Sequence, residues 1–307
     1  MSTPTAVVFP GQGTQIPGMG SVWSGTPEWD TVVGRAESVL GEGVGRLLID
    51  ADAAELSRTR NAQLAVLLTS LLAWEAIKSA VAPVAFAGHS LGQVTALIAS
   101  GALDFDAGVR FAAIRADRTQ AAADARPGVM AALLGATLEH AFIGCAAAPD
   151  ACWIANDNAD GQVVLAGTPE GLEAGVAAAK AAGARTARPL AVGGAFHTPL
   201  MQPAVEALRD DLSTVTFRTS AAPIVSNADG LAYGADASAD DWRERSAVHV
   251  ATTVRWRSVQ PTLVALGATQ LYEVGHGSML AALAKRTIAG VQVVSVATPA
   301  DAAGVVT

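Results

Sequence analysis

The sequence has little cysteine, little basic charge and no long apolar run. Cys145 and Cys152 are its only cysteines, too few for a disulfide framework and without zinc-finger spacing, so we expect both to be packing residues. The net charge of −8 argues against nucleic-acid binding. No apolar stretch has membrane-spanning length, and the first residues lack a basic segment followed by an apolar one. We therefore expect a soluble, cytoplasmic chain with no nucleic-acid or membrane partner.

Metal-binding patterns are also missing. The five histidines have no metal-ligand spacing, and no H-E-x-x-H motif occurs. We expect no metal site. What the chain does have is apolar character: 51% of its 307 residues are hydrophobic and 16% are charged. This composition predicts a substantial core in one large domain or two modest ones.

The stretch FAGHSLG at residues 86–92 matches G-x-S-x-G, the pattern of a serine on a sharp strand-to-helix turn. By itself the match is weak, because glycine and serine are common residues. Its flanks strengthen it. A short apolar strand, PVAFAGHS, precedes the turn, and a helix, LGQVTALIASGAL, follows it. Ser90 is therefore a candidate nucleophile, as an alternative to a small residue in a tight turn.

Two kinds of region alternate along the chain. Residues 1–127 hold an apolar strand ending at Pro10-Gly11, a buried helix at 62–79 and the elbow, and strands resume at 222–230 and 269–280. Between them, 128–196 is predicted to form a strand, a helix, two strands around a polar turn in CWIANDNADGQVVLAG, a helix and a strand. That order is ferredoxin-like. We predict an α/β hydrolase-like domain, 1–127 plus 197–307, with an inserted ferredoxin-like (βαββαβ) subdomain, 128–196. The Ala/Gly-rich tail from Thr298 is predicted to fray.

A serine nucleophile needs a base and an oxyanion site. His197 in GGAFHTPLM is the candidate base, with a histidine that satisfies a loop as the alternative. The N–H of Leu91 is one oxyanion donor, and the glycine-rich FPGQGTQ loop could supply a second or be an ordinary turn. Arginines on the helix at 109–120 could bind a carboxylate or face solvent: Arg110, Arg115 and Arg118.

Seven ordered blocks extend this reading. They span the chain from Phe9 to about Arg286 and are, in order, FPGQGTQ, AQLAVL, GHSLG, Arg115 followed by Gln120, GAFHTPLM, TTVRW and EVGHGSML. Together they resemble the malonyl-CoA:acyl carrier protein transacylases and the similar acyltransferase domains of polyketide synthases. The resemblance implies ping-pong transfer of a malonyl group from malonyl-CoA to the phosphopantetheine thiol of an acyl carrier protein, without a metal or redox cofactor, in fatty-acid or polyketide synthesis.

The resemblance also implies roles for individual residues. Ser90 carries the acyl group and His197 is its general base. The implied binding residues are the backbone N–H groups of Gln12 and Leu91 for the oxyanion, Arg115 held by Gln63 for the malonyl carboxylate, and Phe196 beside the malonyl C2 for specificity. We expect a monomer. An acidic carrier protein would need a local basic patch on this acidic chain, and the candidates, which could equally be a solvated face, are Lys180, Arg185, Arg188, Lys285 and Arg286.

Four positions depart from the family's usual pattern. His249 stands where a glutamine is usual, whose backbone carbonyl orients the catalytic histidine. A backbone role would survive the change, so we expect at most a supporting role for His249. The other departures are Leu64 for proline, Gln93 for glutamate and Thr253 for proline.

Two rival functions remain open. A serine hydrolase, such as an acyl-CoA or acyl-carrier-protein thioesterase, shares the serine and histidine but normally has an acid behind the histidine. Acidic residues lie between Ser90 and His197 without any mark of that role: Asp150, Asp157 and Asp160. The second rival is a carrier-binding module without catalysis, against which the serine, histidine and arginine argue.

Overall fold

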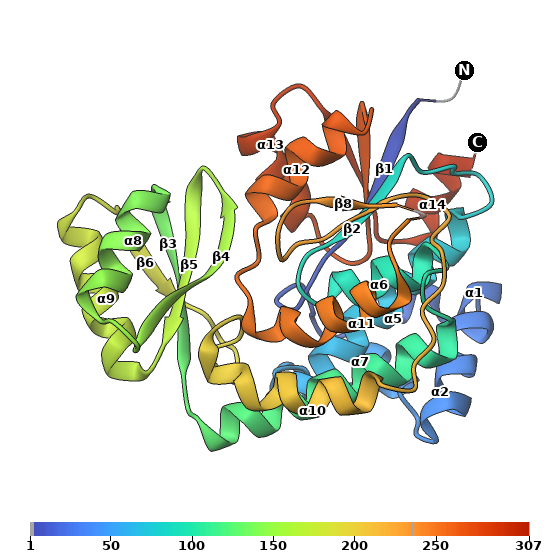
Figure 1. Ribbon diagram of the computed structural model, residues 1–307. Helices are drawn as coiled ribbons and strands as arrows, with labels where there is room; N and C mark the ends of the chain where they lie inside the picture. Colours follow the sequence, from blue (N-terminus) through green and yellow to red (C-terminus); the bar gives the residue numbers. More distant parts are fainter. Residues whose placement is uncertain (1–2, 235, 307) are drawn as a thin grey trace.

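The computed structural model describes residues 3–234 and 236–306, which form two sheets surrounded by helices (Figure 1). The larger sheet has six strands in the order β10-β9-β1-β2-β7-β8, and the smaller has four in the order β4-β5-β3-β6. No helix in the described ranges is long and apolar enough to span a membrane.

The larger sheet is parallel except for β8 at one edge. Its central strand β1, TAVVF, is buried on both faces, as an apolar run in a parallel sheet should be. Alternate residues point to opposite faces, so Val7 and Phe9 enter one core while Ala6 and Val8 enter another. The strands are β1 (Thr5–Phe9), β2 (Ala85–Gly88), β7 (Ile224–Val225), β8 (Ala232–Tyr233), β9 (Gln270–Val274) and β10 (Gln292–Val296).

Helices cover both faces of this sheet (Figure 1). The predicted buried helix is confirmed as α5, which is apolar around most of its circumference and packs inside the core. The helices of this part are α1 (Pro27–Trp29), α2 (Arg35–Leu40), α3 (Gly45–Ile49), α4 (Ala53–Leu56), α5 (Thr59–Ile77), α6 (Gly92–Ala99), α7 (Phe105–Ala125), α10 (Gln202–Leu212), α11 (Ala239–Val248), α12 (Trp256–Ala265), α13 (Met279–Thr287) and α14 (Pro299–Val306).

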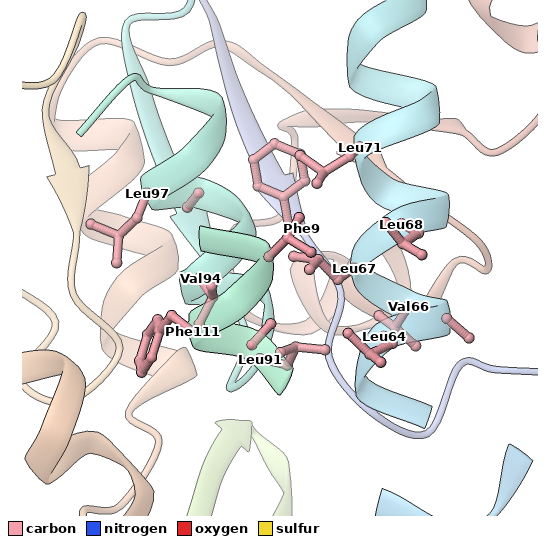
Figure 2. Packing of buried hydrophobic residues seen from close by; sticks show 14 of the residues in the cluster. Phe9, Leu64, Val66, Leu67, Leu68, Leu71, Leu91, Val94, Leu97 and Phe111 are labelled. Atoms are coloured by element: carbon pink, nitrogen blue, oxygen red, sulfur yellow. The ribbon is translucent and has the colours of Figure 1, made fainter. Parts of the chain in front are cut away.

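The residues that follow Ser90 in the elbow are packed in the hydrophobic core. Figure 2 shows Leu91 on the side facing α5 and Val94 near Phe111 of α7, and all of them belong to the same buried cluster as Phe9 of β1. Leu91 is fully buried, which contributes about 2–3 kcal/mol of hydrophobic stabilisation. Packing of the residue after Ser90 therefore fixes the backbone on which Ser90 stands.

The smaller sheet confirms the ferredoxin-like prediction. Its elements follow the order β3 (Val129–Ala136), α8 (Leu138–Ala147), β4 (Cys152–Ala159), β5 (Gly161–Gly167), α9 (Pro169–Ala181) and β6 (Thr186–Pro189), all within residues 128–196. All neighbouring strands pair antiparallel. Thr137 and Thr168 cap the two helices, and the free thiols of Cys145 and Cys152 pack in the core under them, as predicted.

The two faces of this small sheet have different roles. Ala131 and Leu133 point toward α8 and α9, whereas Met130 and Ala132 point the other way and line a cavity shared with the larger domain. The two-residue period of a strand thus gives the subdomain one face for its own core and one for the site.

The prediction of a frayed tail is wrong. Residues Pro299–Val306 form α14, and Ala302 is buried against the large core. The Asp301 carboxylate accepts hydrogen bonds from the N–H groups of Ala297 and Thr298, and Thr298 Oγ1 accepts one from the Asp301 N–H. These reciprocal caps supply the order that an Ala/Gly-rich composition does not indicate.

Candidate active site

Ser90 lies on a turn that only glycine neighbours permit. Its φ is 52°, in the left-handed region where non-glycine residues are uncommon. A Cβ at Gly88 would lie 1.9 Å from the carbonyl carbon of Gly92, and one at Gly92 would lie 2.2 Å from the Phe9 oxygen. The two glycines of G-x-S-x-G therefore let strand β1, strand β2 and helix α6 meet closely enough to expose Ser90.

The Ser90 hydroxyl is hydrogen-bonded to a histidine from the far side of the subdomain insertion. Ser90 Oγ lies 2.8 Å from His197 Nε2. His197 is 4% exposed and also has a positive φ, 63°, with its N–H donating to the Val250 carbonyl at 2.8 Å. The sequence-predicted nucleophile and base are thus brought into contact across 107 residues of chain.

Backbone carbonyls orient His197. Its Nδ1 lies 3.0 Å from the His249 oxygen and 3.1 Å from the Thr252 oxygen, so Nδ1 carries the proton and donates it to these acceptors. Burial, and after it the charge of Arg115, lowers the pKa of His197 to about 3. The ring is therefore neutral, and its unprotonated Nε2 can accept the Ser90 proton.

Arg115 is a buried cation beside the nucleophile. It is 4% exposed, its Nη1 donates to Gln63 Oε1 at 2.6 Å, and its Nη2 donates to Ser90 Oγ at 3.4 Å. Burial lowers the pKa of Arg115 to about 10. Within the described part of the chain it has no carboxylate partner and its Nε has no hydrogen bond. A buried guanidinium without a counter-ion is suited to bind an anionic substrate group.

The other arginines of this helix have surface positions. Arg110 is exposed, and Arg118 forms an ion pair with Asp211. Of the three arginines that the sequence put forward, Arg115 alone reaches the nucleophile.

A cavity of about 400 Å³ opens above Ser90, between the large domain and the subdomain sheet. The cavity is lined by all the residues that the sequence proposed for catalysis and substrate binding: Ser90, His197, Gln12, Gln63, Leu91, Arg115 and Phe196. Among the described residues, neither the Gln12 nor the Leu91 N–H donates a hydrogen bond within the protein. The site thus combines an activated hydroxyl, two free backbone donors and one cation in a single pocket.

Comparison with known proteins decides the family. The sequence model of the acyl transferase domain matches residues 6–301. The chain belongs to this acyl transferase family. A malonyl CoA-acyl carrier protein transacylase of Bacillus subtilis (strain 168) is 35% identical over 301 residues, covering 96% of this chain and 93% of the relative. The enzyme of the same name from Escherichia coli (strain K12) is 35% identical over 294 residues, covering 93% of each.

Solved structures of this acyl transferase family agree with the fold. An acyl-carrier-protein S-malonyltransferase from Burkholderia pseudomallei superposes with a TM-score of 0.93 at 32% identity, over 99% of both chains. A malonyl-transacylase solved in complex with its type II polyketide synthase acyl carrier protein gives 0.93 at 31% identity, again over 99% of both. The similarity therefore covers almost the whole chain, including both sheets.

The sequence reading missed polar residues that the subdomain contributes. In the segment predicted as two strands around a polar turn, Asn156, Asp157 and Asn158 belong to strand β4 and are buried. Asn156 and Asn158, two residues apart, face the cavity, and Asn158 Oδ1 lies 2.9 Å from His89 Nε2. The sequence signal for these residues was three consecutive polar residues next to an apolar strand segment. The same pattern is also typical of a turn, so it could not identify a polar strand that faces the cavity.

The acid required by a hydrolase triad is missing from the residues described. Asp157 and Asp160 form ion pairs with Arg257, and Asp150 lies at a turn with a φ of 58°. The carbonyls of the His249 loop occupy the position behind His197 that such an acid would take. His249 itself does not line the cavity and reaches the site through its backbone.

Proposed function

We propose that this chain transfers a malonyl group from malonyl-CoA to the phosphopantetheine thiol of an acyl carrier protein, for fatty-acid or polyketide synthesis. The observation that carries the proposal is the contact of Ser90 Oγ with both His197 Nε2, at 2.8 Å, and Arg115 Nη2, at 3.4 Å. A base and a carboxylate-binding cation on one hydroxyl suit a substrate with an acyl carbonyl and a free carboxylate. The family's malonyl-transferring relatives support the same substrate.

In the first half-reaction, His197 Nε2 takes the Ser90 proton while Oγ attacks the thioester carbonyl carbon. The N–H groups of Gln12 and Leu91 stabilise the oxyanion, which in such sites is usually the largest electrostatic contribution. The C–S bond breaks, and the CoA sulfur takes the proton back from His197. The malonyl ester on Ser90 remains, with its carboxylate held by Arg115 and Gln63.

In the second half-reaction, the carrier's phosphopantetheine thiol enters the same cavity. His197 removes the thiol proton as sulfur attacks the ester carbonyl, and returns it to Ser90 Oγ as the ester breaks. Phe196 lines the cavity and would limit bulk at the malonyl C2. None of these steps uses a metal or redox cofactor.

We expect the carrier protein to be acidic, so it would dock on a cationic surface, and that surface must be local because this chain is acidic overall. Five exposed cations are available, none of them in an ion pair within the described ranges: Lys180, Arg185, Arg188, Lys285 and Arg286. We propose that docking uses cations of this set, with the chain acting as a monomer.

The experiment that separates transfer from hydrolysis follows the fate of malonyl-CoA. The purified chain is mixed with malonyl-CoA and a type II holo-acyl carrier protein, and malonyl-carrier and free malonate are measured. We expect malonyl-carrier as the main product. Release of malonate at the same rate with and without carrier, with no malonyl-carrier, would favour the hydrolase instead.

A further inference from the structure

We propose that the side chain of His249 is a positioning residue: through Asn227 it ties the loop that orients His197 to the nucleophile elbow. The inference rests on the proposed roles of Ser90 and His197. It adds a residue that has no contact with the cavity and that stands where the family usually has glutamine.

His249 holds His197 with one group and is held by another. Its backbone oxygen accepts a hydrogen bond from His197 Nδ1 at 3.0 Å, and its ring Nε2 is hydrogen-bonded to Asn227 Oδ1. His249 is 5% exposed and begins the short helical turn His249–Ala251 that precedes Thr252, the source of the second carbonyl. A change in the position of the ring therefore moves a backbone oxygen that orients the general base.

Asn227 connects this loop to both sides of the elbow. Its Nδ2 donates to the Gly88 carbonyl at 2.7 Å and to Gln93 Oε1 at 2.8 Å, and its own N–H donates to Gln93 Oε1 at 3.1 Å. Gly88 lies two residues before Ser90 and Gln93 three residues after it. Asn227 is fully buried, so these bonds have no competition from bulk water.

The backbone partners fix the direction of every bond in this set. The Gly88 carbonyl can only accept, so Asn227 presents Nδ2 to it and Oδ1 to His249. An amide oxygen can only accept as well, so His249 donates from Nε2. Burial, helped by the charge of Arg115, lowers the pKa of His249 well below its ordinary value. The ring is therefore a neutral donor.

Gln93 and His249, which lie 156 residues apart, meet on this one asparagine. A glutamine at position 249 could donate to the same Asn227 oxygen through its amide, whereas an apolar residue could not. This contrast gives a matched pair of variants. His249→Gln preserves the donor, and His249→Leu removes it while keeping the site filled.

The test measures the rate constant for acylation of Ser90 by malonyl-CoA, by rapid quenching and intact-protein mass. We expect His249→Leu to slow acylation about tenfold to a hundredfold, because the base is no longer held in its productive geometry. The malonyl-CoA concentration that gives half the maximal rate should not change, since Arg115 and the cavity are intact. We expect His249→Gln to stay within about threefold of the unmodified chain because the hydrogen bond is kept.

A stability control separates positioning from folding. Leu263→Ala truncates a buried residue of α12 outside the site, so it should lower the unfolding temperature without changing the acylation rate. Acylation by folded His249→Leu at the unmodified rate would overturn the inference. If His249→Leu does not fold, His249→Phe removes the same donor while keeping an aromatic ring, and an unchanged acylation rate in that variant overturns it equally. Absence of acylation in the unmodified chain would instead contradict the proposed function.

Discussion

The two residues of the Ser90–His197 hydrogen bond are held in different ways. Ser90 is fixed by close backbone contacts: its flanking glycines leave no room for a Cβ, and Leu91 is packed in the core. His197 is fixed by hydrogen bonds to carbonyls of a loop that is 52 residues away in sequence. Steric contacts of the first kind leave a motif in the sequence, whereas backbone carbonyls of the second kind can be supplied by almost any residue.

This difference explains what the sequence could predict. Gly88 and Gly92 had to be glycine, so the elbow and the strand and helix around it were predicted correctly. The ferredoxin-like order was readable because its helices carry ordinary caps and its strands ordinary apolar runs. The residues made His197 one candidate base, but only the family resemblance favoured it over a histidine that satisfies a loop, because nothing local indicates that Ser90 and His197 meet.

The parts that were missed depend on tertiary context. Asn156 and Asn158 are polar residues inside a strand, and only the cavity and His89 explain their burial. Asn227 follows the short strand β7, and its five hydrogen bonds join it to four residues from distant parts of the chain, Gly88, Gln93, His249 and Arg255. Helix α14 was missed because its order comes from caps and from packing on the core.

The strongest way to break the elbow is to add one methyl group. Gly92→Ala would place a Cβ 2.2 Å from the Phe9 oxygen, which is backbone and cannot move aside easily. We expect a loss of about 3 kcal/mol or more in the free energy of unfolding, together with activity, measured by urea denaturation. The matched control is Gly34→Ala: Gly34 has helical φ and ψ and nothing within 4 Å of the added Cβ, so that variant should keep or slightly gain stability. Equal stability of the two variants would refute the steric account.

Removing the cation beside the elbow should affect substrate choice more than the chemistry. In Arg115→Ala the malonyl carboxylate would enter the cavity without its partner. We expect kcat/KM for malonyl transfer to fall by the equivalent of about 2–5 kcal/mol of transition-state stabilisation. Acetyl transfer carries no carboxylate and should fall far less. The measurement is the ratio of malonyl to acetyl transfer rates, and an equal loss for both would contradict the assigned role of Arg115.

The dependence of stability on pH tests the second residue of the pair, the buried base His197. Burial lowers the pKa of His197 to about 3, so the folded chain keeps this ring neutral while the unfolded chain protonates it below about 6.5. The unfolded state then binds more protons, and the free energy of unfolding should fall by about 1.4 kcal/mol per pH unit for this residue as pH drops below 6.5. His89 and His249, whose pKa values burial also lowers, add to the same loss.

Urea denaturation between pH 7.5 and 5 measures this slope. Over the same range the acylation rate of folded enzyme should not show the decline of an ordinary histidine base, because His197 stays neutral. A decline in kcat/KM centred near pH 6.5 would show that His197 titrates as an exposed histidine does.

The smallest effect is expected from removing the hydroxyl of Thr252, which lies in the loop whose carbonyls orient His197. Thr252 Oγ1 donates to the Val248 carbonyl at 2.9 Å, while the backbone oxygen of Thr252 accepts from His197. Thr252→Val removes the side-chain bond and keeps the backbone carbonyl, so we expect a loss of about 1 kcal/mol in stability and only a few-fold change in acylation rate. A loss comparable to that of His197→Ala would mean that the hydroxyl, and not the carbonyl, serves the base.

The most direct test of the central claim is the intact mass of the chain after mixing with malonyl-CoA, beside Ser90→Ala. The account predicts a gain equal to one malonyl group on the unmodified chain and no gain on Ser90→Ala. The same gain on both would place the acyl group on another residue and contradict the assignment of Ser90. No gain on either, with no malonate released, would contradict malonyl-CoA as the substrate.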